Sequence, residues 1–108
     1  MKVIFHLNEE KKTNEVLANI RNLRKDMEDV EVELLVNGMA VRDFVQDSNY
    51  EGRVKIMMDD SIPIKVCSNS LKGLHIDEEE LLEGVDIVPA GVSELVKKQE
   101  EGWAYIKP

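Results

Sequence analysis

The only cysteine of the chain is the residue best placed to do chemistry. Cys67 follows an apolar run that ends at Val66, and it precedes Ser68 and Asn69, either of which can begin a helix. Unpaired backbone N–H groups at the start of a helix favour a thiolate and lower the pKa of a cysteine. Such a thiolate is a nucleophile or a carrier of a transferred sulfur. The alternative is a small buried residue that ends a strand.

Polar and small residues follow three other apolar runs. In an open parallel sheet, ligands bind beyond the carboxyl ends of the strands, where these residues would lie. We therefore expect them to converge with Cys67 on one rim, in a single pocket lined by polar side chains and backbone N–H groups. The candidate ligand-binding residues are Asn8, Asn37, Gly38, Ser68, Asn69, Pro89, Ala90 and Gly91.

Other reactive groups have weaker patterns. His6 lies in an apolar run and His75 in a polar one, and neither has a partner at the spacing of a metal site, so no metal is expected. The acidic runs at residues 59–60 and 78–80 are typical of solvated loops and helix ends. The sequence contains no nucleophile elbow of a Ser-His-Asp hydrolase, no Walker loop and no G-x-G-x-x-G, so nothing in it favours nucleotide binding.

Composition narrows the class of protein and its partners. The 108 residues predict one domain, 1–108, and 43% hydrophobic with 33% charged residues is typical of a soluble globular chain. A net charge of −8 repels nucleic-acid phosphate and anionic membranes, so neither is expected as a partner. The apolar start is too short for a signal peptide, and no run approaches a membrane span. We expect a cytoplasmic protein, in which a lone thiol stays reduced.

Strand and helix patterns alternate along the whole chain. Short apolar runs predict strands at residues 3–7, 30–36, 62–66, 85–88 and 103–106. Apolar residues recur at helical spacing between them, most clearly from Val16 to Met27, with Thr13 or Asn14 as the expected N-cap. Strands joined by helical crossovers form parallel sheets. We therefore expect a three-layer α/β fold, with a five-stranded, mostly parallel sheet and helices on both faces.

Two short patterns predict where further helices begin. Ser48 is followed three residues later by Glu51, and Asp77 is followed in the same way by Glu80. This spacing is that of the capping box, in which the two side chains bond to each other's backbone N–H groups.

Three segments of the sequence resemble the DsrE/DsrF-like family, and in particular its small stand-alone archaeal and bacterial members. The segments are VCSNSL at residues 66–71, GVDIVPAGV at residues 84–92 and QEEGWAYI at residues 99–106. The likeness covers nearly the whole chain. It implies a flavodoxin-like, five-stranded parallel sheet and assembly into homotrimers or hexamers.

The resemblance also implies a role for the cysteine. Better-studied relatives carry a persulfide in sulfur relay on a cysteine in the loop after the third strand, and Cys67 matches that position. The sequence departs from the relay proteins at the next residues, because Ser68, Asn69 and Ser70 replace small apolar residues and a basic one.

Three hypotheses follow. In the first, the chain is a sulfur carrier of the sulfurtransferase type, in which Cys67 takes a sulfane sulfur from a donor protein and passes it to an acceptor protein without a cofactor. In the second, the same rim binds a small anionic or polar ligand without catalysis. In the third, the chain has a purely oligomeric, structural role.

Overall fold

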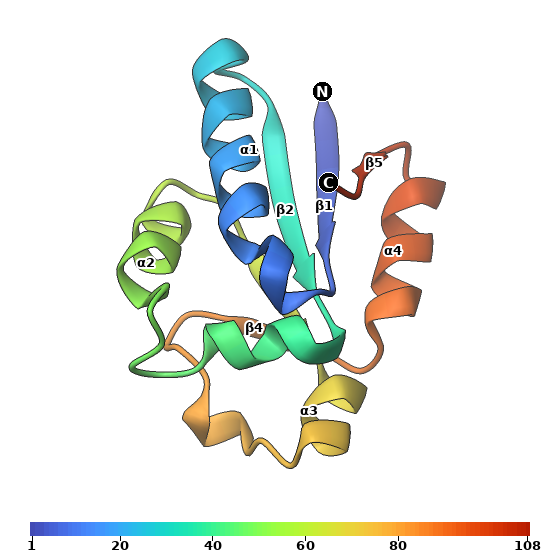
Figure 1. Cartoon of the computed structure of the whole chain (residues 1–108). Coiled ribbons are helices and arrows are strands. Elements are labelled where there is room, and N and C mark those ends of the chain that lie inside the picture. Colours follow the sequence, from blue (N-terminus) through green and yellow to red (C-terminus); the bar gives the residue numbers. More distant parts are fainter.

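One parallel sheet runs through the computed structural model, which describes residues 1–108 (Figure 1). Its strands lie in the order β4-β3-β2-β1-β5, and every neighbouring pair is parallel. The strands are β1 (Lys2–Leu7), β2 (Glu31–Val36), β3 (Ile64–Cys67), β4 (Asp86–Val88) and β5 (Ala104–Ile106). The five-stranded α/β architecture predicted from the alternating pattern is confirmed.

The strand order decides which face each helix covers. Successive strands β1 to β4 step in one direction across the sheet, and the chain then returns past β1 to β5. Because crossovers are right-handed, this reversal places the last helix on the opposite face from the first two. The helices are α1 (Thr13–Asp26), α2 (Glu51–Asp59), α3 (Ser68–Leu74) and α4 (Gly91–Glu100), with 3-10 turns η1 (Glu10–Lys12), η2 (Gly38–Phe44) and η3 (Glu78–Glu80).

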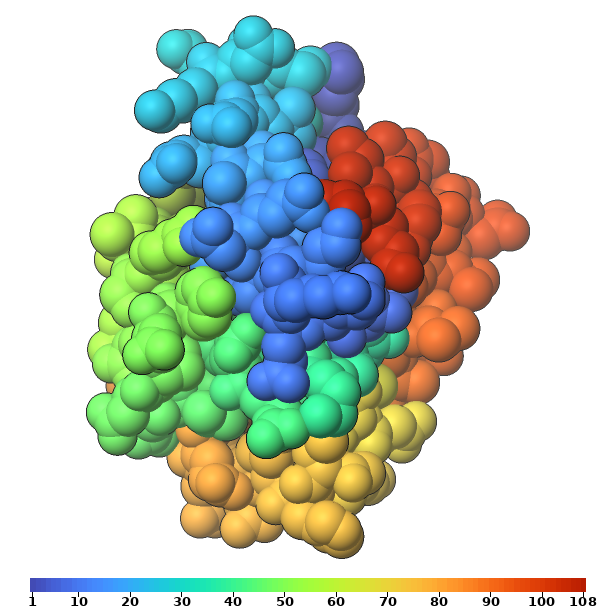
Figure 2. Space-filling model, viewed as in Figure 1, coloured from blue at the N-terminus to red at the C-terminus, as the bar shows by residue number.

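Each face of the sheet has its own apolar core. The larger core joins 21 buried residues from the strands, α1, α2 and the segment around η2. The smaller core, under α4, contains only Ile4, Leu35, Leu95 and Trp103. Figure 2 shows the surface on the α1 side, where η2 and α3 close the lower end of the molecule. None of the helices is long and apolar enough to cross a lipid bilayer.

Alternation along the strands places several polar side chains on the face covered by α4. Side chains two residues apart in a strand point to the same face. His6 therefore shares its face with Ile4, and Asn37, directly after β2, shares its face with Leu35. The sheet thus carries polar groups to its carboxyl edge on the side where α4 begins.

The start of the first helix differs from the prediction. Lys12 is the N-cap of α1, not Thr13 or Asn14, and no side chain caps this end. The hydroxyl of Thr13 instead donates to Asp43 Oδ2 at 2.6 Å. The preceding 3-10 turn, η1, explains the difference, because the backbone at Lys12 is already helical when α1 begins.

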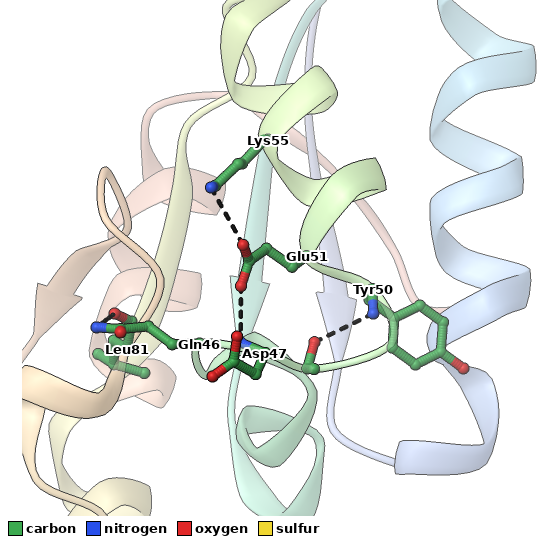
Figure 3. A network of polar contacts seen from close by, with 7 residues as sticks. Gln46, Asp47, Tyr50, Glu51, Lys55 and Leu81 are labelled. Carbon is green, nitrogen blue, oxygen red and sulfur yellow. Dashed lines mark hydrogen bonds and ion pairs between the residues drawn. The ribbon is translucent and has the colours of Figure 1, made fainter.

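The two capping patterns have different outcomes. Asp77 and Glu80 form the predicted box at η3. At α2, however, Glu51 Oε1 accepts the N–H of Asp47 at 2.7 Å, and Ser48 Oγ accepts the N–H of Tyr50 at 3.1 Å (Figure 3). The prediction of a box at Ser48 is therefore wrong in its bonding, because Asp47 adopts a left-handed turn at φ 67° and α2 begins later.

Candidate functional site

Cys67 is held by hydrogen bonds from two loops. It is the last residue of β3 and the N-cap of α3, so Ser68 and Asn69 lie inside the helix and do not cap it as predicted. Burial raises the pKa of its thiol. Hydrogen bonds from the Ser70 side chain and from the backbone N–H groups of Gly91, Ser70 and Asn69 outweigh burial and bring the pKa below its ordinary value.

The hydroxyl of Ser70 connects Cys67 to the loop after β2. The backbone N–H of Gly38 donates to Ser70 Oγ at 2.8 Å. The hydroxyl proton of Ser70 is then available to the Cys67 sulfur, and this is the largest of the four hydrogen bonds that lower the thiol pKa. Gly38 has a φ of +61°, and a Cβ there would lie 3.0 Å from the carbonyl oxygen of Asn8. The loop after β2 therefore requires glycine to reach this position.

The first residue of α4 is pressed against the same loop. A Cβ on Gly91 would lie 3.1 Å from Leu35 Cδ1, 3.2 Å from Asn37 Nδ2 and 3.3 Å from Asn37 Cβ. Because Gly91 has no side chain, the start of α4 can approach the sheet closely enough for its N–H to reach Cys67.

A hydrogen-bonded chain of three side chains lies beside this contact. His6 Nε2 is 2.9 Å from Asn37 Oδ1, and His6 Nδ1 is 2.6 Å from the Tyr105 hydroxyl. Burial lowers the pKa of His6, the bond to Asn37 raises it, and the charge of Lys107 lowers it further, with a net decrease. His6 is therefore neutral at pH 7. No three His, Cys, Asp or Glu side chains of the chain are grouped as metal ligands.

A shallow groove of about 450 Å³ opens next to Cys67, between the ends of β3 and β4. After β3 the polypeptide continues into α3 on one side of the sheet, and after β4 it continues into α4 on the other side. A crevice forms where neighbouring strands diverge in this way, and it is the usual ligand site of open α/β sheets. The groove is lined by Ser68, Asn69, Lys72, Glu78, Ile87, Pro89 and Ala90.

The predicted site residues fall into two adjoining groups. Four line the groove between β3 and β4: Ser68, Asn69, Pro89 and Ala90. The other four surround the loop after β2, through contacts that join Asn8 to Gly38 and Asn37 to Gly91. Cys67 lies between the groups, since its hydrogen-bond partners come from both the α3 and the α4 starts. The predicted residues thus lie at the carboxyl edge of the sheet as expected, but in two neighbouring groups and not in a single pocket.

The sequence leaves open whether Cys67 is a reactive thiol or a small buried residue. In the structure Cys67 is buried, with only 6% of the residue exposed, as the second alternative expects. The backbone N–H of Gly91, the first residue of α4, is among the groups that hydrogen-bond to its sulfur.

Two side chains of this edge were missed as site residues. The sequence interpretation considered His6 only as a metal ligand, and Tyr105 only as part of an apolar strand. The alternation that places His6 on the same face as Ile4 is visible in the sequence. The pairing of Tyr105 with Ile4 cannot be seen in the sequence, because it requires β5 to add to the free edge of β1.

Four charged residues are clustered further up the face covered by α4. Lys65 Nζ lies 3.6 Å from Glu33 Oε1 and 3.4 Å from Glu94 Oε2, and Lys98 Nζ lies 3.7 Å from Glu33 Oε1. Burial, followed by the hydrogen bond and charge of Glu94, raises the pKa of Glu33 to about 7. The hydrogen bond from Glu33 lowers the pKa of Glu94, so the shared proton resides on Glu33.

A second hollow, of about 430 Å³, lies between α1 and α2 on the face seen in Figure 2. Its floor includes Ile20 and Met57, and Arg21 and Lys25 stand on its rim. It contains none of the predicted site residues and lies on the opposite side of the sheet from α4.

The comparisons with known proteins agree along the whole chain. The model of the DsrE/DsrF-like family matches residues 1–108. Protein MTH1491 of Methanobacterium thermoautotrophicum is 38% identical, with a TM-score of 0.94, and the match covers 99% of this chain and 98% of that one. No curated protein matches.

Two more distant structures share the fold. The ychN protein of E. coli is 19% identical with a TM-score of 0.82, and the match covers 100% of both chains. BT1422 of Bacteroides thetaiotaomicron is 13% identical with a TM-score of 0.79, over 99% of this chain and 94% of that one. At these identities the likeness concerns the fold alone.

Proposed function

This chain belongs to the DsrE/DsrF-like family, and from that premise we propose that it is a sulfur carrier that holds a persulfide on Cys67. The observation that supports the proposal most is the set of donors around one sulfur. A hydroxyl and three backbone N–H groups, from the starts of α3 and α4, act on Cys67. Such donors stabilise the thiolate, which is the form that attacks sulfur.

The proposed transfer is a thiol–disulfide exchange in two balanced steps. The Cys67 thiolate attacks the outer sulfur of a donor persulfide, so that a new S–S bond forms on Cys67 while the S–S bond of the donor breaks and the donor leaves as a thiolate. In the second step, a thiolate of the acceptor attacks the outer sulfur, and Cys67 leaves as a thiolate. No net oxidation occurs in either step, so no cofactor is required.

The lowered pKa of Cys67 suits both steps. A thiol with a lower pKa is more fully ionised at neutral pH, and a lower-pKa thiol is also the better leaving group in the return step. The partners would be a sulfur-donor protein and an acceptor protein, and the cytoplasm is the proposed compartment because a lone thiol stays reduced there. Intact-mass measurement before and after exposure to glutathione persulfide tests the proposal directly.

A second candidate function is the binding of a small polar or anionic ligand without catalysis. The groove between β3 and β4 supports it, because Lys72 and the hydroxyl and amide groups of Ser68 and Asn69 line it independently of the thiol. A Cys67→Ser variant that still gains thermal stability from sulfate, while taking up no sulfur, would favour this function over relay.

We also propose that residues 1–108 act as one domain that assembles into a homotrimer or a hexamer. Apolar side chains are exposed on α4 and β5, where Val92 is 65%, Val96 57% and Ile106 40% exposed. Soluble domains usually cover apolar patches of this kind with a partner. A second copy of the chain is the partner that the family resemblance implies.

A further inference from the structure

Three side chains from three neighbouring strands form a continuous hydrogen-bonded chain. Tyr105 comes from β5, His6 from β1, and Asn37 directly follows β2. The two heavy-atom distances, 2.6 Å and 2.9 Å, are those of well-formed hydrogen bonds. Nothing in the two-step sulfur transfer described above uses these side chains, although they end next to the start of α4.

The donor and acceptor groups determine which way each hydrogen bond between Tyr105, His6 and Asn37 runs. Asn37 Oδ1 can only accept, so His6 must carry its proton on Nε2 to bond with it. Since His6 is neutral, its Nδ1 is an acceptor, and the Tyr105 hydroxyl must donate to it. A phenol hydroxyl is a stronger hydrogen-bond donor than acceptor, so Tyr105 favours the Nε2–H tautomer of His6, and that tautomer favours the Asn37 orientation in which Oδ1 faces His6.

The opposite end of the Asn37 amide faces the site. Its nitrogen, Nδ2, lies 3.2 Å from the position that a Cβ on Gly91 would occupy. The N–H of the same Gly91 bonds to the Cys67 sulfur. Nδ2 makes no hydrogen bond within the chain, because the one side-chain bond of Asn37 uses Oδ1. The two N–H bonds of Asn37 Nδ2 therefore have no acceptor within the chain, and they lie next to Gly91 at the start of α4.

We propose that Tyr105 and His6 are positioning residues that hold the Asn37 amide so that its N–H₂ group donates to the outer sulfur of a persulfide on Cys67. The inference rests on the proposed function and adds a specific donor to it. The outer sulfur of a persulfide anion carries the negative charge and extends one bond beyond the cysteine sulfur. The hydroxyl and backbone donors act on the inner sulfur, whereas Asn37 would act on the sulfur that is transferred.

The test measures how strongly each variant holds sulfur. Each protein is equilibrated with glutathione and glutathione persulfide, and the loaded fraction is read by intact mass. We expect Asn37→Leu to lower the loading constant about tenfold, since a hydrogen bond to a charged group is lost. Tyr105→Phe should lower it about two- to threefold, because both imidazole tautomers then become populated and the amide is free to turn. Tyr50→Phe is the matched control, since Tyr50 is the only other tyrosine and lies beside α2 (Figure 3).

Two further readouts separate positioning from damage to the fold. Nitrogen-15 NMR of the imidazoles should show His6 as the Nε2–H tautomer in the wild type and as a mixture in Tyr105→Phe, with His75 unchanged. The pKa of the Cys67 thiol should stay the same in both site variants, because Asn37 is not among its partners. A thiol pKa that moves in step with the loading constant, or loading and tautomer that match the Tyr50→Phe control, would overturn the inference.

Failure of the proposed function can be told apart from failure of this inference. If the wild type takes up no sulfur, relay is wrong, and the unloaded thiol still reports on the Asn37 donor. The donor should favour an anionic reagent next to Cys67, so the ratio of iodoacetate to iodoacetamide alkylation rates should fall at least threefold in Asn37→Leu. An unchanged ratio would overturn the placement of the donor itself.

Discussion

The backbone N–H of Gly38 donates to the hydroxyl of Ser70 at 2.8 Å, and this bond turns the Ser70 hydroxyl proton toward Cys67. A turn after β2 thereby influences the acidity of a thiol at the end of β3. The contact joins two of the loops at the carboxyl edge of the sheet, and it is the first relationship that substitution can test.

Ser70→Ala should raise the pKa of the Cys67 thiol, because the largest of the effects that lower it is the hydrogen bond from the Ser70 side chain. The rate of alkylation by iodoacetamide as a function of pH reports this pKa. Ser68→Ala is the control, since Ser68 is not among the hydrogen-bond partners of Cys67. Equal profiles for the two variants would remove Ser70 from the account.

Gly91→Ala should destabilise the protein by roughly 1–3 kcal/mol, because the new methyl group would lie only 3.1 to 3.3 Å from Leu35 and the Asn37 side chain and would push them aside. It should also raise the pKa of Cys67 by moving the Gly91 N–H away. Urea denaturation measures the first effect. Gly52→Ala is matched to it, since a Cβ at Gly52 meets nothing within 4 Å, and it should stabilise α2 by up to about 1 kcal/mol. A stable Gly91→Ala protein would show that close approach of α4 is not required.

The sequence predicts much of this fold because its signals are local. Short apolar runs and helical stripes are set by neighbouring residues, so the five strands and α1 are confirmed with small shifts at their ends. The capping box at Asp77 forms as predicted, whereas the one at Ser48 does not, since the φ of Asp47 redirects the chain. No local pattern contains that redirection.

The site is predicted less completely, because it depends on contacts between distant segments. The loops that carry Asn37, Cys67 and Gly91 could be placed at one edge from topology alone. The link from Tyr105 to His6 joins residues 99 positions apart and requires the order of the strands. The close packing of Gly91 against Leu35 and Asn37 is also a tertiary effect, and for the same reason the sequence leaves open whether Cys67 is accessible or buried.

Glu33→Gln should flatten the pH dependence of stability. The pKa of Glu33 rises from 4.5 to about 7 on folding, so its stabilising contribution is complete below about pH 4.5 and is lost as pH rises to about 7. The variant should therefore be more stable than the wild type at pH 8, by on the order of 2 kcal/mol, and nearly equal at pH 5.

Urea denaturation at several pH values measures this difference between wild type and Glu33→Gln. The lowered pKa of His6 acts in the same pH range with the opposite sign, but it is common to both proteins and cancels in the difference. The lowered pKa of Glu94 matters only at more acidic pH. A difference that does not change between pH 5 and pH 8 would show that Glu33 is already charged in the folded state.

Val96→Glu should dissociate the proposed homotrimer, because it introduces a charge into the exposed apolar surface of α4. Light scattering coupled to size exclusion should give about three times, or six times, the 12.3 kDa chain mass for the wild type and a lower mass for the variant. Ile56→Glu is the control, since Ile56 is 70% exposed but lies on α2, across the sheet. A wild-type protein that remains monomeric at micromolar concentration would contradict the assembly.

The central claim is that Cys67 carries a transferable sulfur, and intact mass after treatment with glutathione persulfide tests it most directly. The wild type should gain about 32 Da, the mass of one sulfur, and lose it again to a thiol acceptor, because both steps are exchanges at the same atom. Cys67→Ser should gain nothing, since a hydroxyl cannot hold a transferable sulfur. A folded wild-type protein that gains no mass, or a Cys67→Ser variant that gains as much, would contradict the account.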